Sequence, residues 1–163
     1  MVCKLLNGEY KVDVLFIAPG NASGVYQNLA TDYSAIEPPT WALLLAESCR
    51  SIDYKVGLID VNAEKLSNEE VVNRLNILKP RLICFVIYGQ NVNAGTTSMA
   101  GATVLSSYIK ECGLTIPISY VGSHIQAVPI KTLNEEPSID FGFTNEGVYA
   151  LRNVLSQPEI NIN

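Results

Sequence analysis

The sequence predicts an α/β fold, a doubly wound parallel sheet of five strands with helices on both faces. Five β-rich apolar segments alternate with helical segments along the chain. The strand segments are apolar throughout rather than alternating, as expected for parallel strands that are covered on both faces. Right-handed crossovers then favour the strand order 2-1-3-4-5. The length of 163 residues corresponds to one domain.

The predicted strands are short runs rich in β-branched and aromatic residues that end at proline, glycine or polar residues. Pro19 and Gly20 end the first strand, and Gly122 ends the fourth. The strands are expected over residues 12–18, 56–61, 82–88, 117–121 and 139–143.

Helix boundaries follow from start and stop signals. Pro38 and Pro39 precede the first helix, and Ser67 with Glu70 forms a capping box at the start of the second, which Pro80 stops. Helices are expected over residues 40–51, from Ser67 to before Pro80, over 97–111, over 127–134 as a short helix or turn, and over 147–155. The whole is a flavodoxin-like or Rossmann-like arrangement.

Composition excludes several classes of protein. Hydrophobic residues make up 48% of the chain and charged residues 17%, which is too apolar for a disordered protein. The net charge is −5 and the 11 Lys and Arg are dispersed, so no nucleic-acid partner is expected. No apolar run approaches the ~18 residues of a membrane span, and none is expected. The four cysteines lack metal-site spacing, and the cytoplasm is the expected location.

In this architecture ligands bind at the carboxyl ends of the strands, near the switch point between the first and third strands. The loops expected there cover residues 19–37, 89–96, 122–126 and 144–147. Common phosphate chemistry does not fit them. Gly20 and Gly24 lack the Gly-Lys-Ser/Thr of a P-loop, and Ala18 and Tyr88 stand where a phosphoacceptor domain needs carboxylates. Asp60 ends the second strand without a glycine fingerprint, so we interpret it as a solvated carboxylate.

Two polar residues near this edge are open to more than one interpretation. The chain has one histidine, His124, which leaves no general base for a Ser-His-Asp device. We expect His124 to form a hydrogen bond with a neighbouring loop or with a ligand. Glu146 would either accept a ligand hydroxyl or cap the last helix, and we expect capping.

The order of these segments resembles the cobalamin-binding domains that precede the barrel of radical S-adenosylmethionine enzymes. Residues 14–19 are similar to the strand-and-proline opening of that family, and residues 37–46 (EPPTWALLLA) to its Tyr-Pro-Pro-Leu-Gly-Leu stretch. Residues 56–62 resemble its second strand, and residues 121–127 (VGSHIQA) its Gly-Gly-Pro-His-Pro-Thr-Ala turn. Residues 139–147 (IDFGFTNEG) resemble its Ile-Asp-Tyr-Val-Val-Arg-Gly-Glu-Gly ending. The resemblance covers residues 12–155, and its strength lies in the ordered set.

The resemblance implies a corrinoid lying flat over the carboxyl edge, with its nucleotide tail beside strands three to five. The small residues Gly89, Gly122 and Ser123 would let the tail approach the backbone, so a larger side chain at Gly122 is expected to block it. Tyr88 and Glu146 would offer polar contacts. The complete set of implied cofactor-binding residues is Pro19, Gly20, Asn21, Tyr88, Gly89, Gly122, Ser123, His124, Thr144, Asn145, Glu146 and Gly147.

The chain departs from the family at informative places. No Asp-x-His-x-x-Gly motif follows the first strand, so the resemblance implies base-off cobalamin without a histidine ligand. Ser123 replaces a glycine, and Thr144-Asn145 replaces Arg-Gly. No Cys-x-x-x-Cys-x-x-Cys is present, so the 4Fe-4S cluster and S-adenosylmethionine would belong to a barrel outside this chain.

The expected organisation is therefore a cobalamin-binding domain over residues 1–155, with residues 156–163 as a tail or the start of a linker to that barrel. The chain alone is expected to have no catalytic residues and no metal ligands. Its parent would be a methyltransferase or an enzyme that modifies tetrapyrroles, lipids or natural products. Two alternatives stay open, a cobalamin-free structural or docking module of such an enzyme and an unrelated flavodoxin-like binder of a nucleotide or flavin.

Overall fold

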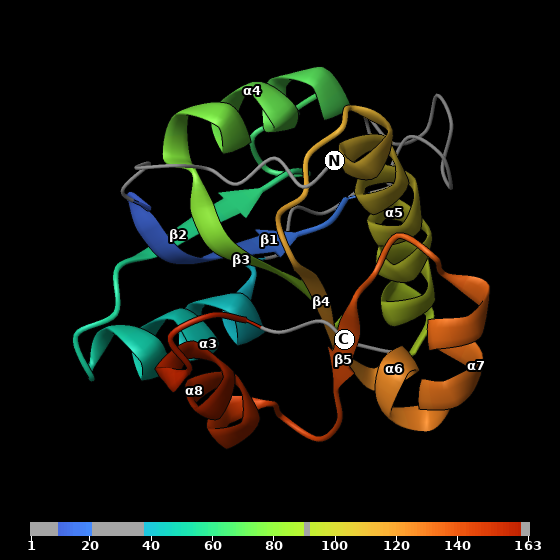
Figure 1. The fold of residues 1–163 in the computed structure, drawn as a ribbon. Coiled ribbons are helices and arrows are strands. Elements are labelled where there is room, and N and C mark those ends of the chain that lie inside the picture. The colour runs from blue at the N-terminus through green and yellow to red at the C-terminus, as the bar shows by residue number, and fades with distance from the viewer. Residues whose placement is uncertain (1–9, 21–37, 90–91, 161–163) are drawn as a thin grey trace.

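The computed structural model describes residues 10–20, 38–89 and 92–160. Its centre is one parallel sheet with the order β2-β1-β3-β4-β5, which confirms the predicted fold class (Figure 1). The strands are β1 (Val12–Ala18), β2 (Val56–Asp60), β3 (Pro80–Ile87), β4 (Ile118–Gly122) and β5 (Phe141–Phe143). The helices are α3 (Thr40–Arg50), α4 (Asn68–Leu78), α5 (Val92–Glu111), α6 (Ser123–Ala127), α7 (Pro129–Glu135) and α8 (Val148–Ser156).

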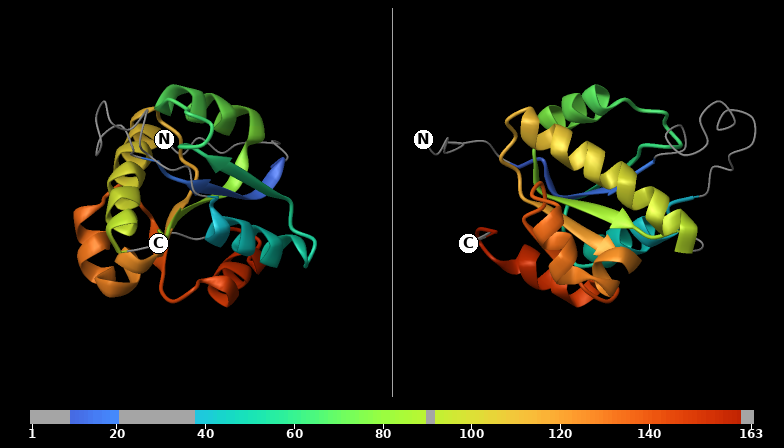
Figure 2. Two further views of the ribbon diagram at one scale, coloured as in Figure 1. Left: turned by 180° about the vertical axis from the view of Figure 1, so that it is seen from behind. Right: turned by 90° about the vertical axis from the view of Figure 1, so that its right-hand side faces the viewer.

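Helices cover both faces of the sheet. Helices α4 and α5 lie on one face and α3 and α8 on the other, while α6 and α7 lie beside the β5 end (Figures 1 and 2). Along β1, Leu15 and Ile17 join the apolar cluster under α4 and α5, whereas Val14 and Phe16 join the cluster under α3 and α8. All four are fully buried, which explains why the strand segments are apolar without alternation.

The parallel register brings the carboxyl ends of all strands to one edge. Ala18 lies opposite Asp60, Ile87 opposite Gly122, and Val121 opposite Phe143. The chain passes from β1 to β2 in one direction and from β3 to β4 in the other. The switch point between β1 and β3 is where this architecture places its ligands.

The predicted capping box is present at the start of α4. Ser67 Oγ accepts a hydrogen bond from the Glu70 amide at 3.3 Å, and the Ser67 amide donates to Glu70 Oε2 at 2.8 Å. These bonds satisfy two amides that the first helical turn leaves unpaired.

Most element boundaries shift by one or two residues from the sequence prediction; β3, for example, begins at Pro80 rather than at 82. Helix α5 begins at Val92 rather than at 97, and residues 123–127 form helix α6 rather than a loop. Helices α5 and α6 approach each other closely at Gly95 of α5. A Cβ at this position would lie 3.0 Å from Ser123 Oγ of α6. Strand β5 starts at Phe141 rather than at 139, and the Asp140 carboxylate just before it accepts the Ile118 amide at 2.7 Å.

The thiols of Cys49 and Cys84 lie in the core between α3 and the sheet, and their chemistry tests this packing. Burial raises the pKa of Cys49 from 9.0 to about 11 and that of Cys84 to about 12. We expect both to resist alkylation at pH 8 in the folded protein, whereas the exposed Cys112 reacts; peptide mass spectrometry checks this. The free energy of unfolding should also fall as pH rises above about 9, because only the unfolded thiols then ionise. Rapid modification of Cys84 under native conditions would contradict the packing.

Candidate ligand site at the carboxyl edge of the sheet

Tyr88, the first residue after β3, connects separate elements at the carboxyl edge. Its hydroxyl donates a hydrogen bond to the carbonyl oxygen of Asn145 at 3.0 Å, in the loop between β5 and α8. Its ring packs against Trp41 in the first turn of α3, with ring centroids 4.8 Å apart and planes inclined by 31°. Burial raises the pKa of the Tyr88 hydroxyl, and the carboxylate of Glu146 raises it further. The structure therefore brings Tyr88, Asn145 and Glu146 together, as the sequence predicted of residues at one edge.

Trp41 is a member of this site that the sequence reasoning did not select. It is the one tryptophan of the chain, and 42% of its surface is exposed. The signal was present, because a large aromatic residue in the first turn of a helix after β1 must lie near the carboxyl edge. Only the folded structure shows that it meets Tyr88.

The β5–α8 loop is held in an unusual backbone conformation. Asn145 has φ +56° and Gly147 has φ +71°, both in the left-handed region. Gly147 is also confined, since a Cβ there would lie 3.0 Å from Val121 Cγ2. The expectation that Glu146 caps α8 is wrong, because Gly147 is the N-cap residue and the helix start has no side-chain cap within the described part of the chain. Thr144, Asn145 and Glu146 are exposed.

Gly20 and Gly122, at this edge, pack closely against other parts of the chain. A Cβ at Gly122 would lie 2.1 Å from the carbonyl oxygen of Ile87, and one at Gly20 would lie 2.6 Å from Asn62 Cβ. Their missing side chains thus make room for neighbouring parts of the chain. The expectation that a larger residue at Gly122 would act only by blocking a ligand is therefore wrong.

Ser123 and His124 lie in the first turn of α6. Ser123 is exposed and His124 is half-buried. The His124 imidazole has no hydrogen bond to any residue that the structure describes, so the expected bond to a neighbouring loop is not seen there. Among the other predicted site residues, Pro19 is buried and Gly89 half-buried at the same edge, and Asn21 lies outside the described residues.

Asp60 forms hydrogen bonds within the turn that follows β2. Its Oδ1 accepts the Ala63 amide at 3.0 Å, and its own amide donates to Glu64 Oε1 at 3.2 Å. The carboxylate thus organises a turn, which agrees with our interpretation that it is not a ribose ligand.

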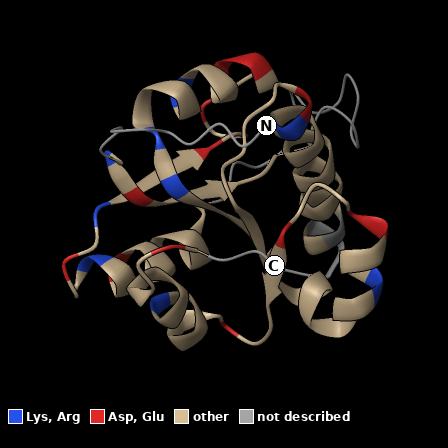
Figure 3. Ribbon diagram, viewed as in Figure 1, with Lys and Arg blue, Asp and Glu red and all other residues tan. Residues whose placement is uncertain are grey.

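Charge is sparse at the candidate site. The predicted site residues include one acidic side chain, Glu146, and no Lys or Arg. Lys and Arg lie on separate elements around the molecule and form no cluster in the view of Figure 3. Within residues 10–20, 38–89 and 92–160, no group of three or more His, Cys, Asp or Glu could hold a metal ion. No helix in these ranges is long and apolar enough to cross a membrane.

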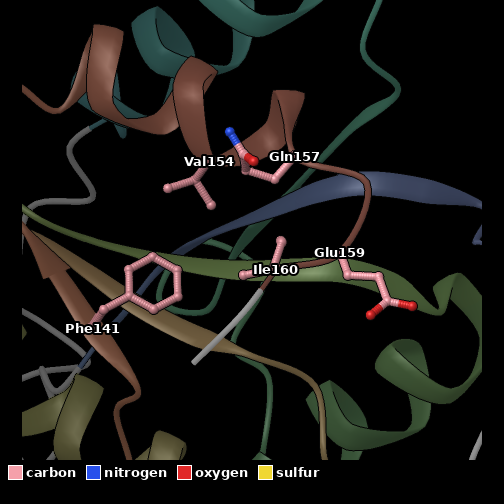
Figure 4. Close-up of a pocket in the computed structure, with 5 residues that line it drawn as sticks. All are labelled: Phe141, Val154, Gln157, Glu159 and Ile160. Carbon is pink, nitrogen blue, oxygen red and sulfur yellow. The ribbon is translucent and has the colours of Figure 1, made fainter. Parts of the chain in front are cut away.

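A pocket of about 180 Å³ lies at the opposite, amino edge of the sheet (Figure 4). It is lined by Phe141, Val154, Gln157, Glu159 and Ile160. The nearby Arg81, on β3, donates to the carbonyl oxygens of Leu155 at 2.9 Å and of Gln157. These bonds hold the chain beyond α8 against the sheet, so the pocket is a product of that packing and is separate from the carboxyl-edge site.

Comparison with known proteins gives structural neighbours only. No protein-family model matches the chain, and no curated protein matches its sequence. The chain is similar to the radical S-adenosylmethionine methyltransferase TsrM from Kitasatospora setae, in a structure with cobalamin and a 4Fe-4S cluster bound. The TM-score is 0.68 and the identity 11%, and the match covers 88% of this chain and 24% of that chain. With a tryptophan substrate and an S-adenosylmethionine analogue bound, TsrM gives a TM-score of 0.64 and 13% identity over 88% of this chain and 25% of that chain. This chain spans about a quarter of the length of TsrM.

A second kind of neighbour shares the fold. The C-terminal part of E. coli RcsC, which contains a linker region and a phosphoreceiver domain, gives a TM-score of 0.55 and 14% identity over 95% of this chain and 50% of that chain. In the present structure β1 ends at Ala18 and Tyr88 follows β3, so these two strands do not end in the carboxylates of a phosphoacceptor. At these low sequence identities the structural similarities show the fold alone: the chain has the doubly wound fold that cobalamin-bound TsrM also contains.

Proposed function

We propose that this chain binds cobalamin at the carboxyl edge of its sheet and orients it, as a domain of a radical S-adenosylmethionine enzyme. The proposal is supported by the ordered resemblance of residues 12–155 to such domains and by the shared fold with cobalamin-bound TsrM. The observation that carries it furthest is the site at the switch point, where Trp41, Tyr88 and the β5–α8 loop meet.

The chemistry of these residues fits a corrinoid better than a nucleotide polyphosphate. A corrin is a broad, largely apolar macrocycle with neutral amide side chains around its rim. The aromatic pair Trp41 and Tyr88 offers apolar surface, and exposed Ser123, Thr144 and Asn145 offer neutral hydrogen-bonding groups. The predicted site residues include no Lys or Arg to balance the charges of a polyphosphate, and Glu146 would repel them.

In this proposal the chain acts by binding and positioning. Cobalamin, when bound, supplies the chemistry of methyl transfer or a related modification. The absence of an Asp-x-His-x-x-Gly motif after β1 favours base-off cobalamin without a histidine ligand. The cluster and S-adenosylmethionine would be held by a radical S-adenosylmethionine domain. We propose that this domain approaches the carboxyl edge, where exposed apolar residues of α3 (Trp41, Leu43 and Leu44) provide surface for a partner.

Titration with hydroxocobalamin tests the proposal. Because the one tryptophan lies at the site, binding there should quench Trp41 emission in step with the change in the corrin absorption spectrum. Binding of a flavin or nucleotide without hydroxocobalamin would favour the flavodoxin-like alternative. Failure of all three ligands to bind would favour a cobalamin-free docking module.

Thr144→Phe should weaken hydroxocobalamin binding about tenfold or more. Thr144 is exposed beside the Tyr88–Asn145 contact, so a phenyl ring there would occupy ligand space without entering the core. The matched control is Thr115→Phe, because Thr115 is also exposed but precedes β4 at the amino edge. Equal dissociation constants for the two variants, measured by absorbance titration, would place the ligand elsewhere.

A further inference from the structure

We propose that Tyr88 is a positioning residue, whose ring fixes Trp41 and whose hydroxyl fixes the β5–α8 loop, so that one side chain sets two parts of the ligand site. The effect on ligand binding rests on the proposed function, whereas the effect of Tyr88 on Trp41 and on the loop does not depend on it. Tyr88 lies between α3 on one side and the β5–α8 loop on the other.

The hydroxyl contact acts on the exposed part of the β5–α8 loop. Asn145 is exposed and adopts φ +56°, a conformation that non-glycine residues adopt only when surrounding contacts enforce it. The helix that follows begins at Gly147 without a side-chain cap in the described chain. The 3.0 Å bond from Tyr88 to the Asn145 carbonyl thus connects this turn to the end of β3, 57 residues earlier.

The ring contact acts on the other part of the site. Trp41 is 42% exposed, so its indole would be free to change rotamer without a neighbour on one side. The tilted packing at 4.8 Å restricts the indole and presents its outer surface to a ligand. Ring and hydroxyl contribute separately, and substitutions can separate them.

The experiment compares Tyr88→Phe and Tyr88→Leu with the wild-type protein. Without ligand, Tyr88→Phe should accelerate hydrogen exchange in the peptide spanning residues 144–151 and leave Trp41 emission unchanged, since only the hydroxyl is lost. Tyr88→Leu should accelerate the same exchange and also shift Trp41 emission. Hydroxocobalamin binding should weaken about fivefold in Tyr88→Phe, the effect of one hydrogen bond, and more in Tyr88→Leu. Tyr54→Phe is the matched control, because Tyr54 is a half-buried tyrosine beyond the far end of α3, and it should change none of these readouts.

The outcomes separate this inference from the proposed function. Unchanged exchange of residues 144–151 in Tyr88→Phe would overturn the positioning role, whatever the ligand. Faster exchange with an unchanged dissociation constant would overturn the connection between the loop and the ligand. If the wild-type protein fails to bind hydroxocobalamin while the exchange and emission effects appear, the proposed function is wrong and the structural role of Tyr88 is supported.

Discussion

Gly122→Ala should destabilise the domain by at least about 3 kcal/mol, the largest effect that we expect from a single methyl group. The added Cβ would lie 2.1 Å from the Ile87 carbonyl oxygen and 2.6 Å from its carbon, which are backbone atoms of the adjacent central strand. The backbone at Gly122 also has φ +154°, which side chains rarely adopt. Relief of the clash requires β3 and β4 to separate where Ile87 pairs with Gly122.

Gly113→Ala provides the matched control, because it separates backbone strain from the clash. Gly113 also has a positive φ, +79°, but a Cβ there would meet nothing within 4 Å. We expect a loss of about 1 kcal/mol, from backbone strain alone. Urea denaturation of both variants measures the difference, and equal losses would contradict the close approach of the two strands.

Asp140→Ala should lower the free energy of unfolding by about 2 kcal/mol. The carboxylate accepts the Ile118 amide at 2.7 Å and the Lys110 ammonium at 2.9 Å, and the Asp140 side chain is 16% exposed. Truncation leaves a partly buried amide and a partly buried ammonium without this partner, and it disconnects α5 from the start of β4 and β5.

The control for this prediction is Asp13→Ala. Asp13 accepts a backbone amide in the same way, from Lys55 at 2.7 Å, but it has no ion pair among the described residues. We expect a smaller loss, about 1 kcal/mol, by chemical denaturation. Asp140→Asn should fall between the two aspartate-to-alanine variants, because the amide keeps an acceptor for the Ile118 amide. A loss in Asp140→Ala no larger than in Asp13→Ala would show that the ion pair contributes nothing.

The fold was predictable because local signals and global topology agree. Three signals favour the same doubly wound arrangement: the apolar strands such as β1, the Ser67–Glu70 capping box, and the right-handed crossover rule. Element ends were less predictable where tertiary contacts override local preference. The first turn of α5 contains Gly95, which is unfavourable in an isolated helix but lets this helix approach Ser123.

The site was predictable only to the level of the sheet edge. The topology rule identified the loops, and Tyr88, Asn145 and Glu146 do meet there. Side-chain contacts between distant segments are not encoded in spacing, so Trp41 was missed. Small residues were also ambiguous, because a glycine at a strand end serves protein packing or ligand approach equally well in sequence. At Gly122 the structure shows protein packing.

Hydrogen–deuterium exchange with and without saturating hydroxocobalamin tests whether cobalamin binds at the carboxyl edge of the sheet, because it reports both binding and its location. We expect slower exchange at the carboxyl edge, in the segments after β3 and β4 and in residues 144–151, with no change in residues 154–160 beside the pocket at the amino edge. No change anywhere, or slower exchange confined to the amino edge, would contradict it.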